Sequence, residues 1–158
     1  MATARSLTGL GILMMIVLSV AGAEVSTTQS GLTWYQGLAR PSWTPPDWLF
    51  GPVWTNLYVL MAVAAWLVWR QGGWAGAKAA LALFGVQLVL NAAWSPVFFG
   101  LERVGAALAV LVALWVAILA TAVAFWRCSR VAGILMLPYL AWVTFAGALN
   151  FAIWRMNP

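Results

Sequence analysis

The side chains best suited to chemistry in this chain are its tryptophans, of which there are twelve among 158 residues. An indole offers a flat apolar face and one N–H donor, so it suits both the edge of a bilayer and the wall of a pocket for flat ligands. Many of them lie where apolar runs meet polar breaks. One group lies in a proline-rich stretch, Trp34-Tyr35 through Pro41-Ser42-Trp43-Thr44-Pro45-Pro46-Asp47-Trp48.

Groups for acid–base or metal chemistry are scarce. The chain has no histidine, the usual general base and metal ligand, and its single cysteine, Cys128, excludes an intrachain disulfide and a cysteine metal cluster. The three carboxylates, Glu24, Asp47 and Glu102, are far apart in sequence and lie at the edges of the apolar runs. We therefore expect no catalytic arrangement and no metal site. No apolar run holds a charged side chain in its interior, so pumps, proton relays and ion pathways are disfavoured.

Uncharged polar groups do occur within the apolar runs, beside aromatic rings and at helical spacing. The sets are Gln87, Asn91 and Ser95 beside Trp94; Trp54 with Tyr58; and Tyr139, Trp142, Ala146, Leu149 and Asn150. An amide that faces lipid costs several kcal/mol, so these faces should point inward. The amides either bond helices together or line a central pocket with Ala146 at its floor. The stretch rich in Trp and Pro favours the pocket.

The elements that must position these groups are membrane-spanning helices. The chain is 65% apolar and 7% charged, and its mean hydropathy of +0.94 lies outside the soluble range. Lipid accepts only helices or closed barrels, and long runs without alternation indicate helices. We predict an all-α integral membrane protein with five transmembrane helices in a single domain. The approximate spans are Leu7–Val25, Leu49–Trp69, Ala79–Gly100, Val104–Trp126 and Val131–Trp154.

The connections predict an up-and-down bundle, because three of the four are short and make sequential helices antiparallel neighbours. The fourth connection, residues 26–48, is polar at its start and rich in Trp and Pro at its end. Its prolines restrict the backbone, so we predict an ordered lid loop between the first and second helices. Two further prolines, Pro96 and Pro138, are expected to bend the third and fifth helices.

Other features leave alternatives open. The segment before Glu24 ends in Ala21-Gly22-Ala23 and imitates a signal peptide, but its apolar stretch is longer than usual, and we interpret it as the first span. The net charge of +5 comes from scattered residues near span boundaries, so no nucleic-acid partner is expected. The eight basic residues divide five against three between the two sides of the membrane, which is too even to fix the topology. A ridge of small residues on the fourth span serves either the bundle or a dimer: Ala109, Ala113, Ala117 and Thr121.

Several sequence blocks, in order from residue 31 onward, resemble the translocator protein family, also called the tryptophan-rich sensory protein or peripheral-type benzodiazepine receptor family. They cover four of the five spans, which makes the resemblance specific. The blocks are Gly31-Leu32-Thr33-Trp34-Tyr35, Pro41-Ser42-Trp43-Thr44-Pro45-Pro46, Gly51-Pro52-Val53-Trp54-Thr55-Asn56-Leu57-Tyr58, Asn91-Ala92-Ala93-Trp94-Ser95-Pro96-Val97-Phe98-Phe99-Gly100, and Pro138-Tyr139-Leu140-Ala141-Trp142 through Leu149-Asn150.

The resemblance implies a five-helix membrane protein, often dimeric, whose pocket is closed by the loop between the first two helices. Family members bind porphyrins and haem, and some bind cholesterol and synthetic isoquinoline or benzodiazepine ligands. Trp54 and Trp142 match a pair implicated in porphyrin breakdown. By position, the resemblance implies a lid that contains Trp34 and Tyr35, a pocket lined by Trp54, Asn91, Trp94 and Trp142, and ligand contacts from Ala146 and Leu149; we add Tyr58, which shares a face with Trp54.

Three details refine the expected ligand. Without histidine, haem iron would need methionine or tyrosine as its ligand, so we expect ring stacking rather than metal coordination, and no required cofactor. The propionates of a porphyrin could meet Arg40 or another cation of the loop. The proposed cholesterol-recognition pattern has Phe151 where a tyrosine is needed, so we expect weak sterol binding or none.

We therefore predict a homodimeric membrane receptor or carrier that binds porphyrins such as haem and protoporphyrin IX between its helices, with a role in tetrapyrrole sensing or transport. One alternative is light-dependent porphyrin degradation, in which Trp54 and Trp142 would take part. Another is a regulatory membrane protein that binds a partner and has no ligand pocket. The resemblance permits a bacterial membrane or a mitochondrial outer membrane, and the short polar amino terminus favours the bacterial one.

Overall fold

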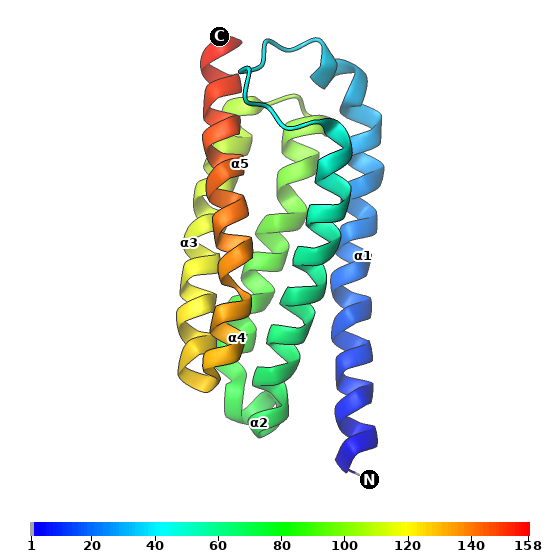
Figure 1. The fold of residues 1–158 in the computed structure, drawn as a ribbon, viewed down its shortest axis with the longest axis vertical. Coiled ribbons are helices and arrows are strands. Elements are labelled where there is room, and N and C mark those ends of the chain that lie inside the picture. Colours follow the sequence, from blue (N-terminus) through cyan, green and yellow to red (C-terminus); the bar gives the residue numbers. More distant parts are fainter. Residues whose placement is uncertain (1) are drawn as a thin grey trace.

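The computed structural model describes residues 2–158, with side chains for residues 7–73 and 75–158. Helices make up nearly all of it and lie side by side in a bundle (Figure 1). Five helical stretches of the described chain are long and apolar enough to cross a membrane. This confirms the predicted all-α five-span bundle. The elements are α1 (Ala2–Gln36), α2 (Asp47–Ser95), the π-helix η1 (Pro96–Gly100), α3 (Val104–Cys128), α4 (Arg130–Leu135) and α5 (Leu137–Met156).

The predicted extent of the lid loop, residues 26–48, is wrong. Helix α1 continues through the polar segment to Gln36, and the connecting loop covers only residues 37–46. The hydroxyl groups of this segment are satisfied without leaving the helix, because Ser26 and Thr27 donate to backbone carbonyls four residues earlier, at 3.2 and 3.1 Å. The first span consequently reaches Gly37 rather than Val25.

The second and third spans are two helical arms of the element α2, which turns back on itself at a kink in its middle (Figure 1). The reversal lies at Gly73, whose φ of 62° falls in the left-handed region that favours glycine, and at Ala77, whose φ and ψ of −127° and 20° are also non-helical. Helical structure therefore extends from both spans into the connection expected between them, residues 70–78. The two arms of α2 lie side by side, as the short connection between the second and third spans predicted (Figure 1).

The regular α-helix is interrupted at or next to both prolines for which a bend was expected. Pro96 begins the π-helix η1, in which the Leu101 N–H donates to the Pro96 carbonyl at 2.8 Å. Pro138 lies in the first turn of α5, so the fifth span is divided into α4 and α5 at Met136. Proline fits the first turn of a helix because its missing N–H would have no partner there.

Two close approaches fix how the helices pack at the loop end of the bundle. Gly31 of α1 faces η1 so tightly that a Cβ atom there would lie 2.7 Å from the Phe99 Cβ and from the Phe99 carbonyl oxygen. At Gly105 of α3, a Cβ would lie 2.9 Å from the Trp154 Nε1 of α5. The predicted ridge on α3 is divided: Ala117 and Thr121 are buried, whereas Ala109 and Ala113 remain exposed.

Candidate functional site

The inner part of the candidate site is a chain of hydrogen bonds centred on Asn91, from the second arm of α2. Its Oδ1 accepts from the Tyr58 hydroxyl at 2.8 Å, and its Nδ2 donates to the Tyr139 hydroxyl oxygen at 2.7 Å. Gln87, Asn91 and Ser95 are at most 3% exposed, which confirms that this polar face points inward. The Gln87 Oε1 is buried and has no hydrogen-bond partner in the described chain. The amide face therefore joins both arms of α2 to α5.

Glu24 extends this chain into α1, because its Oε2 hydrogen-bonds with the Tyr58 hydroxyl. The sequence placed Glu24 at the edge of the first span and predicted spans without ionisable side chains inside. That prediction is wrong for Glu24, which lies well within the span Leu7–Gly37. An ionisable side chain inside a membrane span marks a candidate functional site.

Aromatic rings surround the loop side of this chain. The Trp54 ring lies between two tyrosines, with centroid separations of 5.6 Å to Tyr58 and 6.1 Å to Tyr139. One turn nearer the loop, Trp142 of α5 contacts Phe50 of α2, with ring centroids 5.8 Å apart. Indoles from two helices thus extend the polar centre toward the bundle end.

A second aromatic group lies against η1 and includes the remaining predicted residues. The Trp94 ring stacks on Phe98 at 5.2 Å, and its Nε1 donates to the Asn150 Oδ1 at 3.2 Å. Trp34 and Tyr35, which the sequence assigned to the lid, lie in the last turn of α1 and pack edge-on against Phe98. Leu149 is buried in the same cluster, whereas Ala146 packs against the central core.

The connecting loop is fastened across the end of the bundle. The Asn157 side chain, just after α5, accepts from the Ala39 N–H at 3.0 Å and donates to the Ala39 carbonyl at 2.9 Å. The Trp43 ring of the loop meets Phe145 of α5 with centroids 5.8 Å apart. The loop therefore covers the Trp142 side of the site, and the predicted lid is retained in shortened form.

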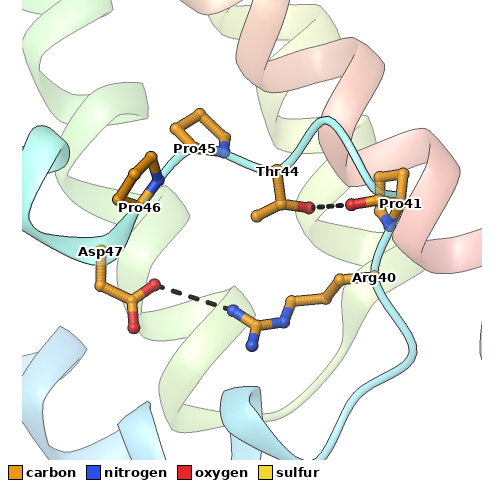
Figure 2. Close-up of a pocket in the computed structure, with 6 residues that line it drawn as sticks. All are labelled: Arg40, Pro41, Thr44, Pro45, Pro46 and Asp47. Atoms are coloured by element: carbon orange, nitrogen blue, oxygen red, sulfur yellow. Dashed lines mark hydrogen bonds and ion pairs between the residues drawn. The ribbon is translucent and has the colours of Figure 1, made fainter.

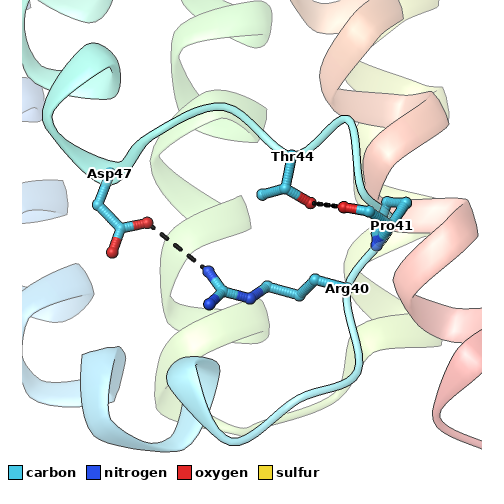
Figure 3. A network of polar contacts seen from close by, with 4 residues as sticks. All are labelled: Arg40, Pro41, Thr44 and Asp47. Atoms are coloured by element: carbon cyan, nitrogen blue, oxygen red, sulfur yellow. Dashed lines mark hydrogen bonds and ion pairs between the residues drawn. The ribbon is translucent and has the colours of Figure 1, made fainter.

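A cavity of about 450 Å³ lies within the arch of this loop (Figure 2). The Arg40 guanidinium points across the arch to the Asp47 carboxylate at 3.7 Å, and Thr44 donates to the Pro41 carbonyl at 2.7 Å (Figure 3). Arg40 also lies over the Tyr35 ring, 4.8 Å from its centroid. The cavity is lined by Arg40, Pro41, Thr44, Pro45, Pro46 and Asp47.

The nine predicted residues lie in two groups, one in the central core and one at η1. Trp54, Tyr58, Trp142 and Ala146 belong to the central group, in which Asn91 hydrogen-bonds with Tyr58 and Tyr139. Trp34, Tyr35 and Leu149 belong to the group at η1, and Trp94 packs against both. The inner end is closed by its own side chains, since Tyr58, Asn91 and Tyr139 are at most 2% exposed.

Sequence reasoning missed the site roles of Tyr139, Trp43, Asn157 and Glu24. Tyr139 stood in the predicted fifth-span stripe, and its hydroxyl could have been matched to the amide face opposite. Trp43 stood in a recognised block. Asn157 follows the last apolar residue and carries no sequence signal that pairs it with Ala39. Among the described side chains, no three of His, Cys, Asp and Glu are grouped to hold a metal ion.

Comparison with known proteins identifies the family. Residues 11–155 match the TspO/MBR family. The chain is 43% identical over 147 residues to protein CrtK of Rhodobacter capsulatus, covering 90% of this chain and 89% of that one. It is 46% identical over 129 residues to the human translocator protein, covering 80% and 76%, and 44% identical over 124 residues to the tryptophan-rich sensory protein of Cereibacter sphaeroides, covering 78% and 77%. This protein is therefore an integral membrane member of the TspO/MBR family.

Proposed function

We propose that this protein is a membrane receptor or carrier that binds porphyrins and related flat hydrophobic ligands at the loop end of its bundle, with a role in tetrapyrrole sensing or transport. One observation carries the proposal. Trp43 of the loop and Trp142 of α5 both contact Phe145, and Trp54 of α2 lies against Tyr58 and Tyr139, the two hydrogen-bond partners of the buried Asn91 amide. Flat apolar walls with a few fixed polar groups are the usual composition of a small-molecule site between helices.

The chemistry of a porphyrin suits this arrangement. Its large ring offers a π-face to indoles, and its two propionates need a cation at the edge of the membrane. Arg40 supplies such a cation beside the loop cavity and is 28% exposed at its side chain. Because the inner end of the site is closed, the ligand would lie toward the loop, between Trp142 and the cavity. Metal coordination is not part of this proposal.

The indole walls are tested by titrating the purified protein with protoporphyrin IX and following tryptophan fluorescence quenching. Trp54→Phe and Trp142→Phe should each weaken the affinity about three- to tenfold, because a smaller ring loses stacking area. Trp126→Phe is the matched control, since Trp126 is exposed at the end of α3 distant from the loop. Affinities unchanged in both site variants would refute the proposed pocket.

The role of Arg40 is tested with a pair of ligands. Protoporphyrin IX should bind Arg40→Gln roughly tenfold more weakly than wild type, since a charge-assisted hydrogen bond is lost. Its dimethyl ester, which has no carboxylates, should bind both proteins equally. Equal loss for the two ligands would place the effect in loop structure rather than in recognition of propionates.

A second candidate function, light-dependent porphyrin degradation, is favoured by the contacts of Trp54. Its ring lies next to Tyr58 and Tyr139, so an indole that has given an electron to photoexcited porphyrin could be reduced again by a neighbouring tyrosine. Illumination with protoporphyrin IX under oxygen should then consume more than one porphyrin per protein, and Trp54→Phe should abolish this turnover. A yield of one or fewer would reject the activity and leave binding.

The proposal includes a homodimer. Ala109 and Ala113 remain exposed on α3, and small residues allow close approach of helices in lipid. Replacing Ala113 with leucine should convert a detergent-solubilised dimer to monomer in size-exclusion chromatography with light scattering. A dimer that survives this change would place the interface elsewhere.

A further inference from the structure

A groove of about 240 Å³ lies on the outside of the bundle between α3 and α5, which stand side by side (Figure 1). Val112 of α3 and Thr144 of α5 are exposed and line its mouth, whereas Leu111 and Val143 are buried beneath it. Both helices belong to membrane spans, so the groove opens toward the acyl chains of the bilayer rather than toward water. None of the nine residues predicted for the porphyrin site lines this groove.

The groove reaches to the depth of one leaflet. On α3 it is lined from Leu108 to Trp115, and Trp115 lies eleven positions after Val104, the residue at which α3 begins. At about 1.5 Å per residue, Trp115 is about 16 Å from that end of the helix, close to half of a hydrocarbon core of about 30 Å. A hydrogen bond crosses the seam at this depth, because the Trp115 Nε1 donates to the Thr144 Oγ1 at 2.8 Å. The groove therefore ends near the middle of the membrane and belongs to the leaflet at the loop end.

The volume of the groove suits a segment of one acyl chain. A methylene group occupies about as much space as a water molecule, roughly 30 Å³, so the groove holds about eight of them. The fused rings of a sterol alone take up more space than this. The size and direction of the groove thus favour a single extended hydrocarbon chain that runs along the helices.

Gly147 leaves one wall of the groove as bare backbone. Helices α3 and α5 run in opposite directions, so three positions from the hydrogen bond toward the loop end, Gly147 of α5 lies level with Val112 of α3. No atom lies within 4 Å of a Cβ atom added to Gly147, so the space in front of it is open. Acyl chains surround the protein in any case, and a bound chain therefore gains only packing contacts. Smooth backbone allows such contacts at close range.

Two exposed arginines lie at the loop end of this seam. Arg103 directly precedes α3, and Arg155 is in the last turn of α5. Within the described part of the chain, the ion pair that is found joins Arg40 with Asp47, and neither Arg103 nor Arg155 takes part in it. Glu102 precedes Arg103 in sequence but forms no ion pair with it there. Since a guanidinium binds phosphate through paired N–H donors, cations stand at the end of the groove where a lipid headgroup would lie.

We propose that the seam between α3 and α5 binds one anionic phospholipid of the loop-end leaflet, of the phosphatidylglycerol class. One acyl chain lies in the groove as far as Trp115, and the phosphate meets Arg103 and Arg155. The groove by itself accepts any acyl chain, so the arginines select the anionic headgroup. A second copy of the protein fits less well, because a two-fold axis along the membrane normal would bring the arginines of both copies together. This site is independent of porphyrin binding.

The acyl-chain contact is tested by titrating the delipidated full-length protein in detergent with dioleoyl phosphatidylglycerol and counting bound lipids by native mass spectrometry. Wild type should bind one lipid ahead of any others. Gly147→Leu should weaken this binding roughly fivefold or more, because its side chain fills about half of the groove. Gly22→Leu is the matched control, since Gly22 on α1 also has no atom within 4 Å of an added Cβ and lies outside the groove.

Val112→Trp fills the groove from the opposite wall and should weaken the binding as Gly147→Leu does. It decides the question if Gly147→Leu does not fold. Unchanged affinity in a folded groove variant overturns the inference.

The headgroup contact is tested at the two arginines. Arg103→Gln and Arg155→Gln should each weaken phosphatidylglycerol binding roughly fivefold, the usual contribution of one cation near an anionic lipid surface. Arg127→Gln, which removes an exposed cation at the opposite end of α3, should bind like wild type. Dioleoyl phosphatidylcholine has the same acyl chains and no net charge, and wild type should bind it roughly tenfold more weakly. Equal affinity for the two lipids, or unchanged affinity in both arginine variants, overturns the inference.

Three further results would assign the groove to another occupant and overturn the inference. Competition by glycerophosphoglycerol, the headgroup without acyl chains, would indicate a site for free phosphate esters. Displacement of the lipid by cholesterol would indicate a sterol site. Conversion of a dimer to a monomer by Gly147→Leu, measured by size-exclusion chromatography with light scattering, would indicate that a second copy covers the groove.

Discussion

Replacing Gly31 with alanine should separate α1 from the π-helix and loosen the aromatic group of the site. The added Cβ would lie 2.7 Å from both the Phe99 Cβ and the Phe99 carbonyl oxygen. Since the second contact is with backbone, a side-chain rotation cannot relieve it, and α1 or η1 must move. Overpacking of this kind costs about 1–3 kcal/mol, and for a chain of this size each kcal/mol lowers the melting temperature by about 2–4 °C, so we expect a decrease of about 2–12 °C.

Thermal unfolding in detergent, followed by tryptophan fluorescence, measures this effect. Gly22→Ala is the matched control, because Gly22 lies on the same helix with no atom within 4 Å of an added Cβ. It should be neutral or more stable than wild type by about 0.5–1 kcal/mol, the ordinary gain of alanine over glycine in a helix. If Gly31→Ala melted at the same temperature as Gly22→Ala, the close approach of α1 to η1 would be refuted.

Two further predictions concern asparagines near the end of α5. Asn157→Ala removes both hydrogen bonds to Ala39, so residues 37–46 should be cleaved faster by protease and a bound porphyrin should dissociate faster. The melting temperature should change little. An unchanged cleavage rate would contradict the attachment of the loop by Asn157. Asn150→Ala leaves the Trp94 N–H without its acceptor and should destabilise the protein by roughly 1–3 kcal/mol in thermal unfolding. Asn56→Ala is the control and should have little effect, because it removes only an exposed hydrogen bond to the Pro52 carbonyl of the same helix. Equal stability of these two variants would refute the assigned role of Asn150.

The inward faces of the helices could be predicted from sequence because a polar side chain that faces lipid has no hydrogen-bond partner there. Gln87, Asn91 and Ser95 recur at intervals of four, and one helical face had to carry them all into the interior. The partners across the bundle could not be predicted in the same way. Which hydroxyl meets Asn91 depends on helix rotation and depth, and Tyr58 and Tyr139 became its partners only once α2 and α5 were placed.

The end of the first span was misplaced for a physical reason. A count of apolar residues stops at Val25, since serine and threonine lower the mean hydropathy of the residues that follow. Their hydroxyls nevertheless bond to carbonyls of their own helix, as Ser30 does to Thr27 at 2.8 Å, so the polar segment remains helical. Glu24 is carried inside the bundle by this continuation, which explains why its part in the site was missed.

The attachment of the loop to α5 couples two distant parts of the chain mechanically. Ala39 and Asn157 are 118 positions apart, yet a double hydrogen bond makes them move together. A tilt of the last helix would therefore pull on the arch over the pocket, and a ligand that lifts the arch would shift that helix in return. We therefore expect a force on the final turn of α5 to move the loop over the pocket, and ligand binding under the loop to move the final turn of α5.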